Sequence, residues 1–190
     1  MKVSQLAVFP TVLALSACSS GGGSDSGGAD VSSEFATKGV QAANLIADYG
    51  DAPLTPVGNM PTGTFVYEGV AGFNFGDVSN EYIASNAEAL ADVTLQADFD
   101  NASISGNLTN FVDYTNTKAA GQVDLRNGTI AGNEFTADAT GSATYNGNPL
   151  VVQGTVDGDF VGPSGNAAIG RIEGTWGGST VSGLIGAERK

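Results

Sequence analysis

Histidine is absent from this sequence of 190 residues, and basic residues are few. Without histidine, the commonest general base and the commonest metal-binding side chain are both missing. Seven Lys and Arg stand against 20 Asp and Glu, which gives a formal net charge of −13. Binding nucleic acid or an anionic lipid surface by charge needs a basic face, so we expect neither interaction. No lipase-type Gly-x-Ser-x-Gly motif occurs, and we predict no catalytic residues, no cofactor and no bound metal.

Cysteine occurs once, as Cys18, so an internal disulfide is excluded. The preceding stretch, Leu6 to Ala17, is mostly apolar, and it is too short to span a bilayer as a helix. It has the size of the apolar region of a secretory signal and ends in Leu15-Ser16-Ala17-Cys18. This ending resembles a bacterial lipoprotein signal, whose Cys thiol is diacylated and becomes the first residue after cleavage. We therefore predict a signal peptide over 1–17 and lipidation of Cys18; the alternative is an ordinary signal peptide with a chance Cys.

The predicted mature chain begins with an anchor and a spacer. Two or three acyl chains would hold it firmly in a bilayer, since one chain alone binds only marginally. Residues 18–34 are rich in Gly, Ser and Asp, and we predict a flexible linker with a reach on the order of 20 Å. By resemblance to enterobacterial sorting, Ser19 in place of Asp favours the outer membrane of a Gram-negative bacterium. Whether the protein would face the periplasm or the outside stays open.

A short helix is predicted next, within a segment over 35–59 that also holds the connection to the rest of the chain. From Phe35 to Tyr49, apolar residues recur at every third position, and these are predicted to form the packing face. We expect the helix to pack on the body or one end of the domain; the alternative is a lone interaction helix. The predicted face consists of Val40, Ala43, Ile46 and Tyr49, with Ala42 and Leu45 beside it.

From residue 60 to 190 the pattern changes to alternation with a period of two, which predicts strands. Turn signals separate the runs, among them Asn146-Gly147 and Gly177-Gly178. Eight such strands in sequence can pair with their neighbours and close, so we predict an all-β fold, an eight-stranded antiparallel up-and-down β-barrel. We expect a monomer. The predicted strands are 63–70, 91–99, 102–110, 121–127, 133–145, 149–161, 168–176 and 180–187.

The apolar set of each strand is predicted to face the lumen. An eight-stranded barrel is about filled by its side chains, so we assign the aromatics to the core rather than to a ligand cage. Small inward residues such as Gly141 and Gly158 fit a tight barrel. In a membrane barrel the apolar set would face lipid; the absence of strong aromatic girdles favours a tethered barrel in water. The predicted core aromatics are Phe65, Tyr67, Phe73, Phe99, Phe135, Phe160 and Trp176.

The last forty residues carry a recognisable pattern. It runs Gly158-Asp-Phe160-Val-Gly162-Pro163, then Gly174-Thr-Trp176, and ends in Gly186-Ala187-Glu-Arg189-Lys190. This resembles the closing strands of the transferrin-binding protein B β-barrel family, although Val161 replaces the family's aromatic. The resemblance implies the barrel, a place on the bacterial surface and capture of an iron-bearing host protein, haem or another solute. The resemblance does not imply that this chain binds transferrin, because the family's surfaces that recognise transferrin lie in segments that this chain does not match.

Two less regular segments, Asp77 to Leu90 and Asn110 to Ala120, are candidates for binding, because long connections in a compact barrel tend to carry function. The alternative is that each is a poorly ordered loop. The carboxylate pairs Asp98/Asp100 and Asp157/Asp159 lie on the polar face and are interpreted as solvated surface. Haem would need Met60 or a Tyr as its ligand, and each Tyr is assigned to packing. The candidate contact residues are Tyr82, Ile83, Phe111, Tyr114 and Lys118.

These observations favour a non-enzymatic binding module, tethered at the outer membrane through Cys18, that engages a protein or small solute through loops at the barrel rim. Iron or haem acquisition is the implied setting. The alternative is a structural envelope lipoprotein with no specific ligand. An enzyme is the third hypothesis, and no residue pattern favours it.

Overall fold

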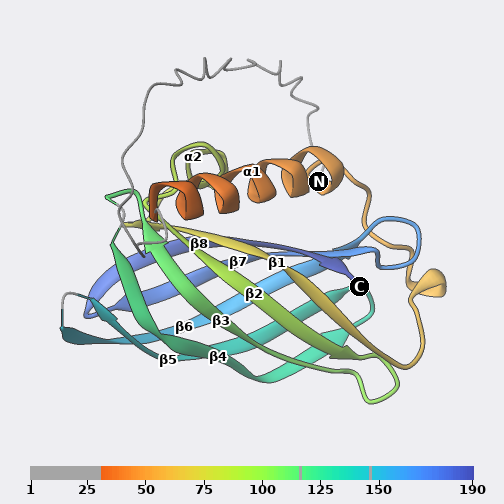
Figure 1. The fold of residues 1–190 in the computed structure, drawn as a ribbon. Helices are drawn as coiled ribbons and strands as arrows, with labels where there is room; N and C mark the ends of the chain where they lie inside the picture. The colour runs from red at the N-terminus through yellow and green to blue at the C-terminus, as the bar shows by residue number, and fades with distance from the viewer. Residues whose placement is uncertain (1–30, 116, 146) are drawn as a thin grey trace.

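A computed structural model describes residues 31–115, 117–145 and 147–190. The predicted signal peptide, the lipidation site Cys18 and most of the predicted linker lie outside the described residues. Two α-helices, a short 3-10 helix and eight strands follow one another along the chain (Figure 1). They are α1 (Val31–Tyr49), η1 (Val57–Asn59), β1 (Thr64–Phe75), α2 (Asn80–Asn86), β2 (Ala89–Asp98), β3 (Ser103–Asp113), β4 (Lys118–Ala131), β5 (Glu134–Tyr145), β6 (Asn148–Val161), β7 (Ala167–Trp176) and β8 (Ser179–Arg189).

The eight strands form a closed antiparallel barrel in sequence order, which confirms the predicted fold class. Each strand pairs with its neighbours in the chain, and β1 also pairs with β8, for example Ala71 with Ile185. Closure leaves no unpaired strand edge among the eight. The tight turn at Gly177-Gly178 has positive φ angles of 59° and 86°, which glycine adopts without strain.

Alternation places the apolar set inside, as expected. On β2, Val93, Leu95 and Ala97 are buried in the lumen, and the residues between them face outward. Two aromatic groups fill the lumen. Near one end, Tyr67, Phe99 and Phe135 contact Phe160 with ring centroids 5.6, 5.0 and 5.3 Å apart. Near the other end, Phe73, Phe75 and Phe111 contact Trp176 at 6.1, 6.1 and 5.3 Å.

The predicted core aromatics are therefore inside. Tyr67, Phe73, Phe135, Phe160 and Trp176 are buried, and Phe65 and Phe99 are partly buried. Gly158 shows why small inward residues are needed, because a Cβ built there would lie 2.4 Å from Cζ of Phe135.

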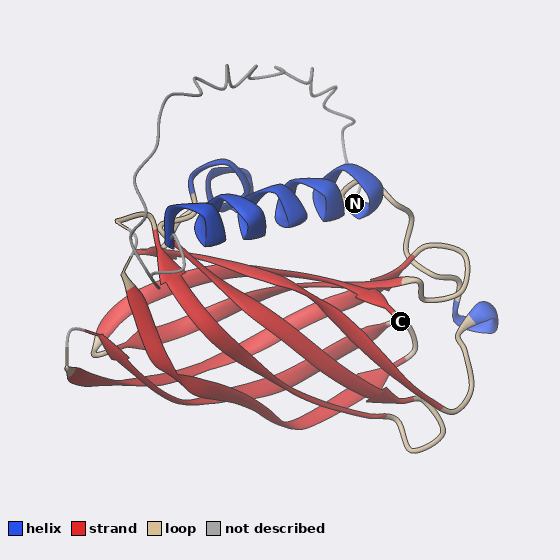
Figure 2. Cartoon of the chain, in the orientation of Figure 1, coloured by secondary structure: helices blue, strands red, loops and turns tan. Residues whose placement is uncertain are grey.

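One helix covers the outer wall of the barrel, as expected. Figure 2 shows α1 and α2 on the same side of the sheet. Under the helices, Val70, Leu90 and Val112 form an apolar patch that packs against Phe35 and Ala42. The patch is outward-facing sheet surface that the helices remove from water.

The predicted packing face of α1 is wrong for three of its four residues, whereas Tyr49 and the flanking Ala42 and Leu45 do lie on the packed side. Val40 is 62% exposed and Ile46 is 44% exposed, and Ala43 also faces solvent. The face turned to the barrel is instead the row Phe35, Lys38, Ala42, Leu45 and Tyr49. Lys38 is buried because its ammonium group pairs with the Asp92 carboxylate on β2.

Several strand ends differ from the prediction. β1 continues to Phe75, β3 to Asp113, and β4 spans Lys118–Ala131. The pairing of β3 with β4 is irregular between Leu108 and Phe111, and that of β4 with β5 between Arg126 and Thr129. Asn110 and Asn127, both with φ of 53°, lie at these irregularities. Each bulge reverses which residues face inward, so the sequence alternation stops there although the strand continues.

One end of the barrel is closed by the segment between α1 and β1. Thr55 is fully buried there, and its hydroxyl donates to the Gly162 carbonyl at 2.7 Å and accepts from the Gly165 N–H at 3.1 Å. The Tyr67 hydroxyl donates to the Gly165 carbonyl at 2.8 Å. The Gly162-Pro163 turn, predicted to lie at the rim, is thus held by buried hydrogen bonds.

Candidate functional site

The opposite end of the barrel is open. β1, β3 and β7 end there, and β2, β4 and β6 begin there, at the left in Figure 1. A cavity of about 300 Å³ lies at this mouth. Its wall is largely aromatic and aliphatic, with Phe75, Phe111, Leu150 and Trp176 among the lining residues. The volume is at the lower end of the range usual for ligand pockets.

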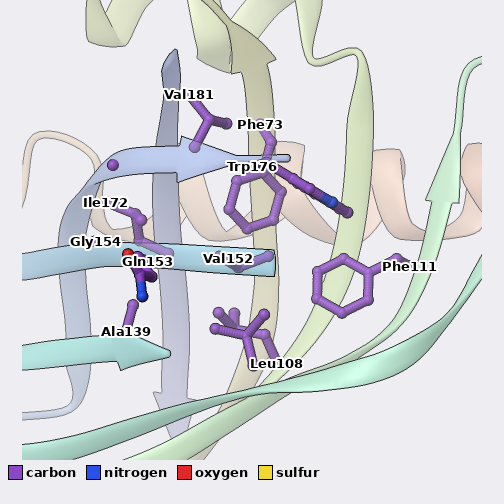
Figure 3. Close-up of a pocket in the computed structure, with 12 residues that line it drawn as sticks. Phe73, Leu108, Phe111, Ala139, Val152, Gln153, Gly154, Ile172, Trp176 and Val181 are labelled. Atoms are coloured by element: carbon purple, nitrogen blue, oxygen red, sulfur yellow. The ribbon is translucent and has the colours of Figure 1, made fainter. Parts of the chain in front are cut away.

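The interior of the barrel below the mouth is closed by packing. Phe73, Phe111 and Trp176 converge with aliphatic side chains of β3 and β6, as Figure 3 shows. The void that remains among them is about 10 Å³. It is too small for more than about one water molecule, so this void cannot admit a ligand, whereas the mouth cavity is large enough for one.

Among the described residues that line the mouth cavity, two aromatic side chains are exposed. Phe75 at the end of β1 is 50% exposed, and Tyr114 in the β3–β4 turn is 65% exposed. Both line the cavity. Exposed aromatics beside a concave apolar surface are typical of recognition sites, because they bury a large area when a partner binds.

Two carboxylates at the rim accept hydrogen bonds from backbone N–H groups. The Glu88 carboxylate accepts from the Phe75 N–H at 2.9 Å, and the Asp113 carboxylate accepts from the N–H groups of Thr115 and Thr117 at 2.9 and 2.8 Å. Both carboxylates therefore shape the rim and give it negative charge. Trp176 differs from them: its Nε1–H is buried and has no hydrogen-bond partner within the described part of the chain.

The structure divides the predicted contact residues. Tyr82 on α2 and Tyr114 are exposed, in line with a binding role. Ile83 and Phe111 are buried, at 1% and 2% exposure. Ile83 is therefore not available for contact, whereas Phe111 lines the mouth cavity. Ile83 packs α2 onto the barrel, where a Cβ built on Gly72 would be 3.7 Å from it, and Phe111 points into the lumen. Lys118 is half exposed and pairs with Glu34 of α1.

The two less regular segments are also more ordered than predicted. Residues 80–86 form α2, in which the Ser79 hydroxyl accepts from the Tyr82 N–H. Most of 110–120 belongs to β3 and β4 and leaves only a short turn. Sequence reasoning missed the cavity residues Phe75 and Leu150, and it assigned Trp176 to the core alone. The sequence held one signal for Phe75: a glycine follows it directly, which is typical of a strand end. In the structure Gly76 has a positive φ of 105°.

The carboxylate pairs lie on the outer surface. A hydrogen bond from the Asn101 side chain to Asp98 lowers the pKa of that carboxyl. Burial and the neighbouring Glu134 raise the pKa of Asp159. Tyr67, considered as a haem ligand, is fully buried and donates to Gly165. In the described ranges no three side chains of Asp, Glu, Cys or His gather as a metal site would require.

The geometry defines a class of protein: an up-and-down barrel with a packed lumen, one closed end, and an apolar mouth. The sequence profile of the C-lobe and N-lobe β-barrels of transferrin-binding protein B matches residues 60–189. The chain belongs to this family, as the closing-strand motif indicated, and the family is one of non-enzymatic binding proteins. Comparison with curated protein sequences finds no match.

Solved structures of transferrin- and lactoferrin-binding proteins match part of this chain. The intact Ap-TbpB, with N and C lobes, is 21% identical over 72% of this chain and 28% of its own, with a TM-score of 0.47. Transferrin-binding protein B of Neisseria meningitidis serogroup B is 20% identical over 72% and 27%, with a TM-score of 0.47. The N-lobe of lactoferrin-binding protein B of Moraxella bovis is 17% identical over 69% and 61%, with a TM-score of 0.38.

The chain spans less than a third of the length of the intact transferrin-binding proteins that it matches. No helix within residues 31–190, as far as they are described, is long and apolar enough to cross a membrane.

Proposed function

We propose that this protein is a lipid-anchored binding module of the bacterial outer membrane, which engages its partner through the open mouth of the barrel. The observation that carries the proposal is the apolar cavity bordered by exposed Phe75 and Tyr114. Family membership supports a binding role, and the relatives' names give transferrin and lactoferrin as partners of those proteins. The partner of this chain is a protein or a small solute, and its anchor is the acylated Cys18.

The anchor is tested by replacing the one cysteine. Wild type and Cys18→Ser are expressed in a Gram-negative host, and the membranes are separated. Wild type should fractionate with the outer membrane, and mass spectrometry should find an acylated N-terminal Cys18. The variant should lose both properties. An unacylated wild-type protein that is freely secreted would overturn the anchor.

The binding role is tested with the lipid-free chain 19–190, immobilised and exposed to host serum or environmental extract, with purified transferrin and lactoferrin as separate samples. A matched variant, Phe75→Ser with Tyr114→Ser, keeps the barrel and removes the exposed aromatics of the mouth. A partner held by wild type and at least tenfold less by the variant supports the proposal. Equal capture by both proteins would contradict a role for the mouth.

The competing hypothesis is a structural envelope lipoprotein with no specific ligand. A deletion strain with weakened envelope integrity and normal uptake of iron and haem, together with no captured partner, would favour it over the binding module.

A further inference from the structure

We infer that α1 is a strap for the mouth of the barrel: while it is docked it fixes the rim in the conformation described, and its release loosens the mouth. The part of the rim concerned is the β3–β4 rim, residues 110–115 and 117–119. This rests on the proposed function, because it names what controls the same mouth. The inference depends on how much of the cavity this rim forms, on the contacts that α1 makes with it, and on a bulge in β3.

The β3–β4 rim forms most of the mouth wall. More than half of the described residues that line the cavity belong to it, namely residues 111–115, 117 and 119. The hairpin is closed by the Asp113 N–H, which donates to the Thr117 carbonyl at 3.0 Å. The shape of the mouth therefore depends on where this hairpin is held.

The first contact runs from α1 to the start of the rim through Asp92 of β2. One carboxylate oxygen of Asp92, Oδ1, pairs with the buried Lys38 ammonium group, and the other, Oδ2, accepts from the Asn110 side chain at 2.7 Å. Hydrogen bonds to an ionised group are stronger than those between neutral groups. Asp92 therefore joins α1 to Asn110, and Lys38 and Asp92 act as positioning residues for the rim.

Two further contacts hold both strands of the hairpin. On β3, Val112 belongs to the apolar patch that packs against Phe35 and Ala42 of α1. On β4, Lys118 lies opposite Val112 and forms an ion pair with Glu34 in the first turn of α1. Movement of α1 away from the barrel would therefore release the rim on both of its strands.

The bulge decides which side chain of β3 enters the lumen. Leu108 is buried inside the barrel, so strict alternation would turn residue 110 inward and residue 111 outward. Asn110, with φ of 53° at the register shift, adds one residue to the strand. Phe111 enters the lumen as a result and meets Trp176 with ring centroids 5.3 Å apart. The bond from Asn110 to Asp92 holds this register.

α1 can leave without unfolding the barrel. The eight strands pair in a closed sheet, and α1 contributes to none of these pairings. Release of α1 removes the cation from Asp92 and uncovers Val112. Both changes favour the register without the bulge, in which Val112 turns inward and Phe111 outward. Trp176 then loses its neighbouring ring, so the released form has a loosened mouth.

A reversible lock tests the strap. A Cβ built on Gly186 of β8 lies 3.5 Å from Leu45 Cβ of α1, which is within the spacing found between disulfide-bonded cysteines. Leu45→Cys with Gly186→Cys should therefore hold α1 on the barrel when oxidised and free it when reduced. Both positions lie outside the rim and the cavity lining. The protein is the chain from residue 18 with Cys18→Ser, which contains all the described residues and no competing thiol.

Hydrogen exchange of backbone amides, resolved by peptide, is the first readout. In the oxidised lock the β3–β4 rim should exchange roughly tenfold more slowly than in the reduced form, because release of α1 is its route of opening. The β2–β3 turn, residues 99–102 at the closed end, is the internal control and should exchange alike in both forms.

Quenching of Trp176 by acrylamide is the second readout, because this residue is the single tryptophan of the chain and lies in the mouth wall. Lys38→Met should raise the quenching constant roughly twofold or more, since the mouth opens locally. Oxidising the lock in the Lys38→Met chain should restore the wild-type value, because α1 is held again. Tyr67→Phe weakens the opposite end of the barrel; it is the matched control and should be quenched as wild type is.

Each readout can overturn the strap. Equal exchange of the rim in the oxidised and reduced lock would show that the rim opens without α1. Equal quenching in wild type and Lys38→Met, or an equal rise in Lys38→Met and Tyr67→Phe, would remove the positioning role of Lys38. Neither readout needs a partner, so a failed capture experiment leaves the strap testable. A partner captured through the mouth by a chain whose rim ignores the lock would overturn the strap and leave the binding module standing.

Discussion

Tyr67 joins the packed lumen to the closed end of the barrel, and its hydroxyl is the group that does so. Tyr67→Phe removes the bond to the Gly165 carbonyl and leaves that oxygen unpaired. We expect a loss of about 1–3 kcal/mol in the free energy of unfolding, measured with urea at neutral pH. Tyr114→Phe, on an exposed tyrosine, is the matched control and should change little.

The same residue predicts a pH dependence. Burial raises the pKa of Tyr67 to about 12, partly opposed by Arg189, against an ordinary value of 10.0. The unfolded chain therefore ionises first. The stability that this phenol contributes is complete below pH 10.0 and is lost as the pH rises through about 12. The difference between wild type and Tyr67→Phe should be constant near neutral pH and shrink in alkali; a constant difference throughout would contradict the assignment.

Whereas Tyr67 stabilises the fold at neutral pH, ionised Asp159 is expected to destabilise it. Burial and Glu134, its cross-strand neighbour, raise the pKa of the Asp159 carboxyl in the fold. Ionised Asp159 therefore opposes folding above its folded pKa, and this effect disappears as the pH falls toward the unfolded value of 3.8. Asp159→Asn should be more stable than wild type at neutral pH and equal to it in acid, by urea unfolding. Asp157→Asn, opposite Arg171 on β7, should show no such gain.

Single residues of the mouth were the hardest to predict. Trp176 carries the alternation and the aromatic character of a core residue, whereas Phe111 is turned inward only by the bulge at Asn110; both are buried. What makes them part of a candidate site is their depth, near the end of the lumen where packing stops. Depth follows from register around the whole barrel, which no local pattern specifies.

At the scale of the element, α1 shows how a helical face is misjudged. Residues spaced strictly by three, such as Val40, Ala43 and Ile46, turn back by about 60° at each step and soon leave a common face. The row that packs alternates steps of three and four and includes a lysine. The packing face of α1 was missed because only apolar residues were counted and this face includes Lys38. The helix itself was correctly predicted.

Lys38 also links α1 to the barrel through an ion pair. The Lys38 side chain is 8% exposed and that of Asp92 is 39% exposed, so solvent reaches the carboxylate of this ion pair but hardly reaches the ammonium group. We expect Lys38→Met to lose about 1–2 kcal/mol in unfolding free energy, since Asp92 is left without its cation. Lys118→Met, whose side chain is 49% exposed in its pair with Glu34, should lose no more than about 0.5 kcal/mol. Equal losses in the two variants would mean that burial does not distinguish these pairs.

Strand prediction failed where alternation is hidden. In β3 and β4 the bulges at Asn110 and Asn127 reverse the inward set, and the predicted strands end at these two residues. In β1 the outward residues Val70 and Asn74 are buried as well, so alternation of polar and apolar residues fades under the helices. Regular strands with one wet face, such as β5 and β6, were predicted almost to the residue.

Close contact between neighbouring strands and rings makes a further prediction. A Cβ on Gly158 would lie 2.4 Å from Phe135 Cζ and 2.5 Å from the Ile169 carbonyl oxygen. Gly158→Ala should therefore lower the free energy of unfolding by about 1–3 kcal/mol. Gly58→Ala is the control, because nothing lies within 4 Å of the new methyl group and its effect should stay within about 0.5 kcal/mol. Matching stabilities for the two variants would mean that the lumen can relax around Phe135.

At the scale of the whole molecule, the basic side chains of the described residues are engaged in the fold. Lys38, Lys118, Arg126, Arg171 and Lys190 each form an ion pair. Arg189 lies over the Phe65 ring at 4.9 Å and donates to the Ser164 carbonyl. Arg171 also holds the start of α2 through Asn80 and the Val78 carbonyl. With a net charge of −13 on the chain, the exterior is acidic, and its few cations are committed to internal contacts.

This charge distribution predicts how the protein meets a membrane. Basic clusters attract anionic headgroups, and neither the composition nor the placement of these side chains supplies one. The chain from residue 18 with Cys18→Ser should therefore stay in the supernatant when sedimented with vesicles of neutral phosphatidylcholine or with vesicles that contain phosphatidylglycerol. The acylated protein should sediment with both, since two or three acyl chains bind without help from charge. Sedimentation of the unacylated chain with the anionic vesicles alone would show a basic surface that the described residues do not form. Sedimentation with both kinds would place a second anchor in the protein itself.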